Sequence, residues 1–310
     1  MEDLKMQSID DIVIDFSSDQ LFLLNICLAF IMFSIALNLT VSDFRRLVNF
    51  PKSSIVGLIS QLLLLPVYTL ILIGLWEVAA SVALGLILVS CCPGGNISNF
   101  SVHLAGGNTA LSVTLTSIVT MCAIVITPAT FQFWASWLPE TQSLLTAVEV
   151  DSLEMILSIT YLVFIPLMLG MFLNHRFHSI AARIRKPVQT LALIIFLAII
   201  LVAVYDNRAD LAYYFQLVFL LVLVHNGGAL LIGYYFARAN GLNLADAKAI
   251  SFETGIQNAG LGLVLVFNFF EGLGGMMLVM AWWGIWDMVS ALLLAGYWRS
   301  RLKKSLVNAN

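Results

Sequence analysis

A carboxylate, Glu253, lies within a long apolar stretch of the sequence and is the residue whose chemistry most needs an explanation. A charged side chain at the centre of a membrane costs several kcal/mol unless it faces a cation, a partner or water. No lysine or arginine lies at a comparable depth in an apolar stretch, so the counterpart of Glu253 is a bound cation, a proton or water. A neutral, hydrogen-bonded carboxylic acid is the alternative.

Neutral oxygen donors in the apolar stretches favour sodium as that cation, because hard alkali ions prefer oxygen ligands. These donors are Gln61, Ser98, Asn99, Ser112, Thr116 and Gln257. Ser112 and Thr116 are four residues apart and therefore share a helix face. Taken alone this pair is weak support, since serine and threonine in membrane helices often bond back to the preceding turn.

Two polar, glycine-bearing segments interrupt the apolar stretches, at residues 93–99 (PGGNISN) and 253–258 (ETGIQN). Pro93 lacks a backbone donor, and Gly94 and Gly95 permit backbone angles that other residues avoid. In hydrocarbon a broken helix survives only where protein, ions or trapped water complete its hydrogen bonds. A simple proline kink is the alternative at Pro93.

The elements that position these residues must be membrane helices. Of the 310 residues, 60% are hydrophobic and 11% are charged, whereas soluble domains carry about 25% charged residues. Several apolar runs exceed the roughly 18 residues that a transmembrane helix needs. We predict an all-α polytopic membrane protein with nine spans, at residues 20–40, 54–76, 79–104, 108–135, 152–173, 187–204, 212–236, 246–270 and 273–297.

Basic residues are distributed unevenly over the loops between these spans. One side holds 13 of the 15 lysines and arginines, namely Arg45, Arg46, Lys52, Arg176, Arg183, Arg185, Lys186, Arg238, Lys248, Arg299, Arg301, Lys303 and Lys304. The other side holds only Lys5 and Arg208, with the acidic N-terminus and Glu77, Glu140, Glu149, Asp151, Glu154, Asp206, Asp210 and Glu271. By the positive-inside rule, the C-terminus is cytoplasmic and the N-terminus lies outside a cell membrane.

The odd number of spans gives spans one to four and spans six to nine opposite orientations. This is the arrangement of an inverted repeat. The polar interruptions fall in the third member of each half. Interrupted helices at matching positions of two halves point to the binding site of a transporter.

Other classes of protein fit less well. The four cysteines, Cys27, Cys91, Cys92 and Cys122, all fall in apolar runs and lack the spacing of a disulfide framework or a zinc site. The first twenty residues are acidic, whereas a cleaved signal peptide begins with a basic segment, so we expect no signal peptide. The sequence has no His-Glu-x-x-His motif, no Gly-x-Ser-x-Gly motif and no paired membrane aspartates, which argues against an enzyme. We expect no nucleic-acid partner, and the sequence implies no oligomer.

Three segments resemble the bile acid:sodium symporter family. Residues 91–99 (CCPGGNISN), 108–117 (NTALSVTLTS) and 253–261 (ETGIQNAGL) are similar to the two crossing-helix signatures of that family, in order and at a suitable separation. The likeness extends over residues 30–298 and includes Gln61 before Pro66 and a His225-Asn226-Gly227 turn in span seven.

The resemblance implies a two-domain fold. Spans two, three, four, seven, eight and nine would form a core at residues 54–135 and 212–297, in which two broken helices cross. Spans one, five and six would form a panel at residues 20–40 and 152–204, with an acidic extracytoplasmic tail at 1–19 and a basic cytoplasmic tail at 298–310. Ten-span bacterial members carry an additional first helix, and this chain resembles the nine-span arrangement instead.

The resemblance also implies two sodium ions as coupling ions and no other cofactor. The first sodium site would comprise Ser98, Asn99, Ser112, Thr116 and Glu253. The second would comprise the side chains of Gln61, Glu253 and Gln257 and the backbone oxygens of Thr254 and Ile256. The anionic group of the cargo would meet Gly95, Asn96 and Asn258 at helix ends, whose positive dipoles favour anions.

The implied function is sodium-coupled symport of a small organic anion, a bile acid or a similar carboxylate or sulfonate, by alternating access across a lipid bilayer. A related carrier that is driven by protons or works as an efflux pump is the alternative, with Glu253 or Asp287 as the proton carrier. A sensor or channel that keeps the carrier fold is a third possibility. Sodium dependence of cargo binding distinguishes the first two.

Asp287 departs from the family pattern. It lies in residues 283–288 (WGIWDM), where the bacterial members typically have histidine followed by asparagine. It could be protonated, pair with a cationic part of the substrate, or lie near the membrane edge. Because an acid in the crevice would repel a carboxylate, zwitterionic or larger amphipathic anions are alternative cargoes. His225 could donate to the substrate, although a lone histidine in a span is more often a packing residue.

Overall fold

The computed structural model describes residues 9–13, 17–37, 39–40, 51–147, 152–206 and 208–307. Several residues used above to predict the topology lie outside this part of the chain. They are Lys5, Arg45, Arg46, Glu149 and Asp151, together with residues 1–8 and 308–310 of the two predicted tails.

The described residues are almost entirely helical and contain no β-strand. Two short elements, η3 and η4, are π-helical turns between α-helices. The elements in chain order are η1 (Ile9–Asp11), α1 (Ser18–Ala36), α3 (Pro51–Ile59), η3 (Ser60–Leu64), α4 (Leu65–Trp76), α5 (Ala80–Cys91), α6 (Asn96–Leu104), α7 (Thr109–Ala135), α8 (Pro139–Ala147), α9 (Ser152–Ile159), η4 (Thr160–Phe164), α10 (Ile165–Arg176), α11 (His178–Asp206), α12 (Arg208–Ala239), α13 (Leu244–Gly255), α14 (Ala259–Phe269) and α15 (Gly274–Val307).

Within the described ranges, 6 helical stretches are long and apolar enough to cross a membrane. They are Ser18–Ala36, Pro51–Trp76, Thr109–Ala135, Ile156–Arg176, Val218–Ala239 and Gly274–Leu302. α5 and α14 are shorter apolar helices. The structure therefore agrees with an all-α membrane protein, and the count of nine spans stays a prediction.

Both stretches with polar interruptions are divided into two helices. α5 ends at Cys91 and α6 begins at Asn96, and α13 ends at Gly255 before α14 begins at Ala259. The simple proline kink considered for Pro93 is therefore wrong. Residues 225–227, in the seventh predicted span, lie in the interior of α12, where the helix continues without a break.

Prolines determine the local form of two other helices. η3 and η4 each end two residues before a proline, Pro66 and Pro166. Proline has no N–H and its ring clashes with the carbonyl four residues earlier, so the helix widens locally. The widened turn η3 carries Gln61. Pro187, where the sixth span was predicted to begin, lies inside the longer helix α11.

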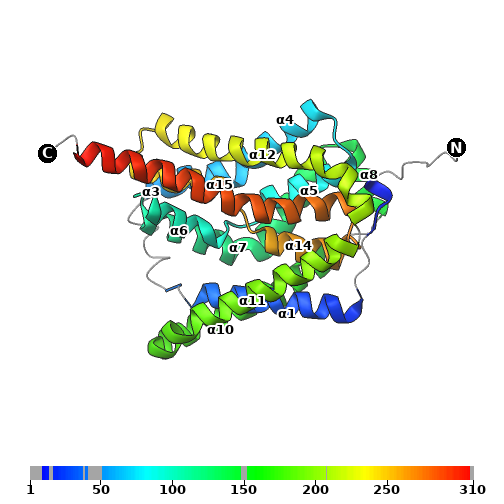
Figure 1. Ribbon diagram of the computed structural model, residues 1–310, viewed down its shortest axis with the longest axis horizontal. Coiled ribbons are helices and arrows are strands. Elements are labelled where there is room, and N and C mark those ends of the chain that lie inside the picture. Colours follow the sequence, from blue (N-terminus) through cyan, green and yellow to red (C-terminus); the bar gives the residue numbers. More distant parts are fainter. Residues whose placement is uncertain are drawn as a thin grey trace.

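The helices form two groups that run roughly along the long axis of the molecule (Figure 1). In one group, α1, α10 and α11 pack against one another. In the other, α12 packs against α13 and α15, and α5 packs against α7 and α15. The groups meet where α1 contacts α14 and where α7 contacts η4, which also packs against α1 and α10. The two helix breaks therefore both lie in the larger group.

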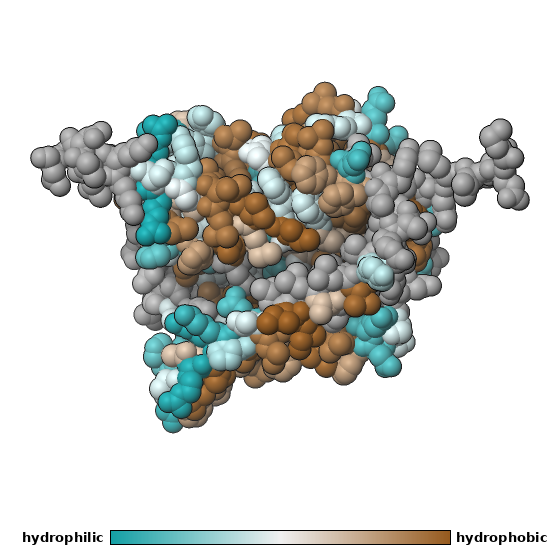
Figure 2. All heavy atoms as spheres, in the orientation of Figure 1, coloured by the Kyte–Doolittle hydropathy of each residue, from teal (hydrophilic) through white to brown (hydrophobic). Residues whose placement is uncertain are grey.

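Apolar side chains dominate the middle of the molecular surface, and hydrophilic side chains gather towards the two ends of the long axis (Figure 2). Large apolar side chains such as Phe22, Leu75, Phe172 and Leu293 are exposed. Soluble monomers rarely expose extended apolar patches. An apolar middle between polar ends is the surface that a protein presents to a lipid bilayer.

Candidate ion and cargo site

The two helix breaks lie against each other. The amide of Gly95 donates to the carbonyl of Ile256 at 3.0 Å, and the amide of Asn258 donates to the carbonyl of Pro93 at 2.8 Å. Each unwound segment therefore supplies hydrogen bonds that the other lost when its helix ended. This is the condition for irregular backbone inside a membrane protein.

Two glycines allow this close approach. A Cβ atom at Gly95 would lie 2.9 Å from the carbonyl oxygen of Gln257, and one at Gly94 would lie 3.0 Å from Oε2 of Glu253. Gly94 and Gln257 also form an isolated antiparallel bridge. A side chain at position 95 would push the breaks apart, whereas one at position 94 would crowd the carboxylate of Glu253. Glycine is therefore favoured here by contact distance.

Glu253, on the last turn of α13, is completely buried and accepts three hydrogen bonds from hydroxyl groups. Oε1 accepts from Ser98 Oγ and from Ser112 Oγ, both at 2.6 Å, and Oε2 accepts from Thr116 Oγ1 at 2.7 Å. Asn99 joins the group, because its Oδ1 lies 2.8 Å from Ser112 Oγ. The five residues expected at the first sodium site are therefore brought together from α6, α7 and α13.

Acceptor oxygens outnumber the protons in this cluster. Each hydroxyl carries one proton, but Ser112 Oγ lies within reach of both Asn99 Oδ1 and Glu253 Oε1. Thr116 Oγ1 lies within reach of Glu253 Oε2 at 2.7 Å and of the Ser112 carbonyl at 3.1 Å. Oxygen atoms that converge without enough protons, around a carboxylate, are a donor set that fits a hard monovalent cation.

Gln61 and Gln257 bring the second set of predicted ligands beside Glu253. Gln61 is completely buried in η3, and its Nε2 donates to Gln257 Oε1 at 3.3 Å, while its own Oε1 has no hydrogen-bond partner. Gln257 Nε2 donates to the carbonyls of Glu253 at 3.2 Å and Thr254 at 2.9 Å. The carbonyl of Ile256 accepts from Gly95. A buried, unpartnered amide oxygen in this place also fits a cation ligand.

The residues expected to contact the cargo do not form one cluster in the way that the predicted sodium ligands do. Gly95 caps the start of α6, and Asn258 caps the start of α14 by accepting from the amide of Leu261 at 3.0 Å. Asn258 Nδ2 also lies 4.0 Å from Met32 Sδ on α1, so this end of the crossing faces the smaller group of helices. The side chain of Asn96 lies outside the described part of the structure.

His225 lies among α4, α12 and α15. Its Nε2 is 2.6 Å from Thr69 Oγ1, its ring stacks on Tyr68 with centroids 5.6 Å apart, and its Nδ1 has no partner. The ring of His225 is therefore packed between helices, with one ring nitrogen that has a hydrogen-bond partner and one that has none. The neighbouring Asn226, to which the sequence analysis assigned no role, donates to the carbonyl of Gly255 at 2.7 Å and so closes the end of α13. The presence of a polar amide in an apolar stretch of the sequence could have indicated a structural role for Asn226.

Asp287 is buried, with 5% of its surface exposed, and lies thirteen residues after the start of α15 at Gly274. The membrane-edge position considered for it is therefore wrong. Its Oδ1 has no hydrogen-bond partner. Gly284, one turn earlier, faces Ala259, since a Cβ atom at Gly284 would lie 3.3 Å from the Cβ of Ala259 at the start of α14.

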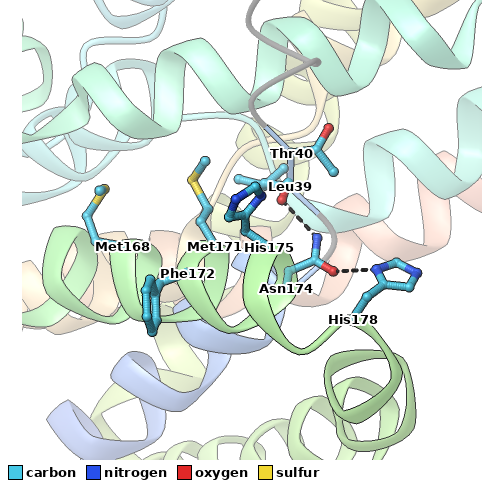
Figure 3. Close-up of a pocket in the computed structure, with 8 residues that line it drawn as sticks. All are labelled: Leu39, Thr40, Met168, Met171, Phe172, Asn174, His175 and His178. Atoms are coloured by element: carbon cyan, nitrogen blue, oxygen red, sulfur yellow. Dashed lines mark hydrogen bonds between the residues drawn. The ribbon is translucent and has the colours of Figure 1, made fainter.

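A cavity of about 430 Å³ lies between the end of α1 and α10 (Figure 3). Asn174 is one of its polar residues: its Nδ2 donates to the carbonyl of Leu39 at 3.0 Å, and its Oδ1 lies 3.0 Å from His178 Nδ1. The residues around it are Leu39, Thr40, Met168, Met171, Phe172, Asn174, His175 and His178. None of the predicted cargo residues lines this cavity.

The profile of the Sodium Bile acid symporter family matches residues 25–213 of the chain. A Bacillus subtilis protein named as an uncharacterized sodium-dependent transporter, YocS, is 34% identical over 91% of this chain and 84% of its own length. An Arabidopsis thaliana protein named as a probable chloroplastic sodium/metabolite cotransporter, BASS1, is 31% identical over 89% of this chain and 66% of its own length. The human ileal sodium/bile acid cotransporter is 26% identical over 78% of this chain and 68% of its own length.

The apolar helices and the paired helix breaks define a multi-pass membrane protein built like a secondary transporter. The chain belongs to the sodium bile acid symporter family. Membership confirms the resemblance seen in the sequence, and it confirms that the chain is a member of a transporter family and not an enzyme.

Proposed function

We propose that this protein is a secondary transporter that couples the entry of sodium to the uptake of a small organic anion. The observation that carries the proposal is the cluster in which Ser98, Ser112 and Thr116 converge on the buried carboxylate of Glu253 at 2.6–2.7 Å. A buried carboxylate without a basic partner needs a cation or a proton. The surplus of acceptor oxygens favours a cation with oxygen ligands.

Two sodium ions would bind on either side of the same carboxylate. One would be held by Ser98, Asn99, Ser112, Thr116 and Glu253, and the other by Gln61, Glu253, Gln257 and the backbone oxygens of Thr254 and Ile256. The unpartnered Oε1 of Gln61 supports the second site. Both sets include residues on the breaks, so ion binding would determine how the breaks are arranged for cargo at Gly95, Asn96 and Asn258, with Asp287 and His225 nearby on α15 and α12.

Alternating access would arise from movement between the two groups of helices. We assign α1, α9, η4, α10 and α11 to a panel and the remaining membrane helices to a core, with nine spans and an inverted repeat. Two observations at opposite ends of α1 support this movement. Asn25 is hydrogen bonded to Asn268 of α14 near one end, whereas Leu39 lines the cavity of Figure 3 beyond the other end.

The basic loops support a cytoplasmic position for the cavity end of α1 and α10. Arg176 ends α10, and Arg183, Arg185 and Lys186 follow on α11. By the positive-inside rule this end would be cytoplasmic and the N-terminus would lie outside. The contact between α1 and α14 would then close the carrier towards the outside, and the cavity would open on the cytoplasmic side.

A sodium titration of purified protein in proteoliposomes tests the proposal. Glu253→Ala should abolish uptake driven by an inward sodium gradient while folding and membrane insertion are retained. Wild-type uptake that is equal in sodium and in potassium but follows a proton gradient would instead identify the proton-coupled or efflux carrier. Sodium-driven uptake that survives Glu253→Ala would contradict the proposal, because no other described carboxylate joins the oxygen cluster.

A further inference from the structure

Many of the buried polar atoms without a hydrogen-bond partner belong to two neighbouring helical segments. Among the described residues, ten buried side-chain nitrogen and oxygen atoms have no hydrogen-bond partner, and six of them belong to two short segments. These six are His225 Nδ1, Asn226 Oδ1, the Nε1 atoms of Trp282, Trp283 and Trp286, and Asp287 Oδ1. The segments touch, because the rings of His225 and Trp283 meet edge to face with centroids 4.8 Å apart. Buried polar groups normally have partners, so these neighbouring donors and acceptors could serve as a binding site for a polar ligand.

A second buried aspartate shows that the fold can satisfy such a group. Asp246 and Asp287 are both 5% exposed. Asp246 accepts from Ser53 Oγ and from Asn108 Nδ2, each at 2.7 Å, so both of its oxygens have a donor. Oδ1 of Asp287 has none. The difference lies in the surroundings and not in the depth of burial.

The atoms without a partner include both hydrogen-bond donors and hydrogen-bond acceptors. The indole N–H groups of Trp283 and Trp286 are donors without an acceptor, and Oδ1 of Asp287 is an acceptor without a donor. A simple carboxylate or sulfonate would satisfy only the donors, and its charge would be repelled by Asp287. A ligand with both an anionic and a cationic group satisfies both sets.

Asp287 lies close to the place where the anionic group of the cargo is proposed to bind. Gly284 faces Ala259, the first residue of α14, and Asp287 follows three residues later on α15. At 1.5 Å per residue, the rise between them is about 4.5 Å. The start of α14 carries the positive end of a helix dipole. The positive end of α14 therefore contacts α15 about one helical turn before Asp287, the carboxylate whose Oδ1 has no donor.

We propose that Asp287 binds a protonated amine of the cargo, and hence that the cargo is a zwitterion with an ammonium group and a carboxylate or sulfonate group. This inference rests on the proposed function and specifies its cargo. The ammonium group would donate to Oδ1 of Asp287. The anionic group would accept from the indole N–H groups of Trp283 and Trp286 and would meet the start of α14.

Matched pairs of compounds that differ only in the amine test this assignment. The pairs are taurine and ethanesulfonate, β-alanine and propionate, and phenylalanine and 3-phenylpropionate. In sodium, at least one zwitterion should raise the thermal unfolding midpoint of the wild-type protein more than its amine-free partner, because a ligand that binds the folded state stabilises it. Asp287→Asn should weaken binding of that zwitterion about 30-fold, the effect of removing one partner of a buried charge pair.

Two outcomes would overturn the inference. One is that no zwitterion of the three pairs stabilises the wild-type protein. The other is that Asp287→Asn leaves the preference of each pair unchanged. Stabilisation by sodium alone is measured in the same experiment and reports on the sites around Glu253. If sodium stabilises both proteins but no zwitterion binds, the cargo assignment fails while sodium coupling stands.

The apo proteins provide a control that needs no cargo. Asp287→Asn removes an unpaired buried charge and should raise the unfolding midpoint without ligand. Asp246→Asn removes a charge that two donors satisfy, and it should lower the midpoint. Equal shifts in the two variants would show that Asp287 is satisfied in the same way as Asp246, which contradicts a binding role.

Discussion

Asn25 on α1 and Asn268 on α14 are 243 residues apart and exchange two amide hydrogen bonds, at 3.2 and 2.9 Å. The pair joins the two groups of helices near the end of α1 that lies away from the cavity of Figure 3. An amide pair between helices in an apolar environment has few competing partners, so it favours one alignment of α1 against α14. Each hydrogen bond contributes only about 1 kcal/mol to stability. This contact must open if α1 and α14 separate during transport.

Cross-linking this contact should stop transport. With Asn25→Cys and Asn268→Cys in a Cys122→Ser background, a short, reducible thiol cross-linker should abolish sodium-driven uptake, and reduction should restore it. The exposed Cys122 is removed because it would react with the reagent. Each single variant with the same reagent is the control. Full uptake by the cross-linked protein would show that α1 and α14 do not separate here.

Removing one hydroxyl from the Glu253 cluster should weaken sodium binding. Thr116→Val keeps the shape of the side chain but removes the donor at 2.7 Å from Glu253 Oε2. Hydrogen bonds to charged groups contribute about 1.5–3 kcal/mol, so the apparent sodium affinity should fall about tenfold or more. The measurement is a sodium titration of uptake or of the unfolding midpoint.

Ser117→Ala is the matched control for that variant. Ser117 lies next to Thr116, but its hydroxyl donates to the carbonyl of Val113 at 2.6 Å and has no contact with Glu253. Its sodium titration should overlay that of the wild type. If both variants lose affinity equally, the effect comes from α7 as a whole and not from the oxygen cluster.

Gln61→Ala should leave sodium-dependent transport in place but weaken it. The variant removes the unpartnered Oε1 proposed as a ligand of the second ion, whereas the cluster of Ser98, Ser112 and Thr116 remains. We expect a shallower dependence of uptake on sodium concentration and residual transport. Gln132→Ala, at an exposed position of α7, is the control. If uptake by Gln61→Ala depends on sodium concentration in the same way as uptake by the wild type, this would argue against a second ion at this place.

Gly95→Ala should destabilise the fold. The new methyl carbon would lie 2.9 Å from the carbonyl oxygen of Gln257, in a backbone contact that cannot move aside. Overpacking of this kind costs about 1–3 kcal/mol, and it should also lower sodium-driven uptake by pushing the breaks apart. Thermal unfolding in detergent measures the first effect.

Gly74→Ala provides the comparison on the same scale. Nothing lies within 4 Å of a Cβ atom at Gly74 in α4, and alanine is about 1 kcal/mol more favourable than glycine in a helix interior. This variant should unfold at the same temperature as the wild type or higher. Equal losses in Gly74→Ala and Gly95→Ala would mean that the crossing tolerates a side chain.

Much of the candidate site follows from residue types alone. Glu253 in an apolar stretch implies a partner because hydrocarbon does not solvate charge. PGGNISN and ETGIQN imply breaks, because glycine, proline and short polar side chains make a continuous apolar helix unfavourable. These properties belong to single residues and short segments, so the sequence by itself determined a membrane protein with two interrupted helices and predicted an oxygen-rich ion site.

Only the tertiary structure determined which of these polar groups form hydrogen bonds with one another and which have no partner. The pairing of Gly95 with Ile256 and of Asn25 with Asn268 joins residues far apart in the chain, and no local pattern encodes such a distance. The same holds for two aspartates of equal burial: Asp246 meets Ser53 and Asn108, whereas Oδ1 of Asp287 meets no donor. Burial follows from the hydropathy of the surrounding helix, but satisfaction of a polar group depends on which side chains of other helices reach it, and packing alone determines that.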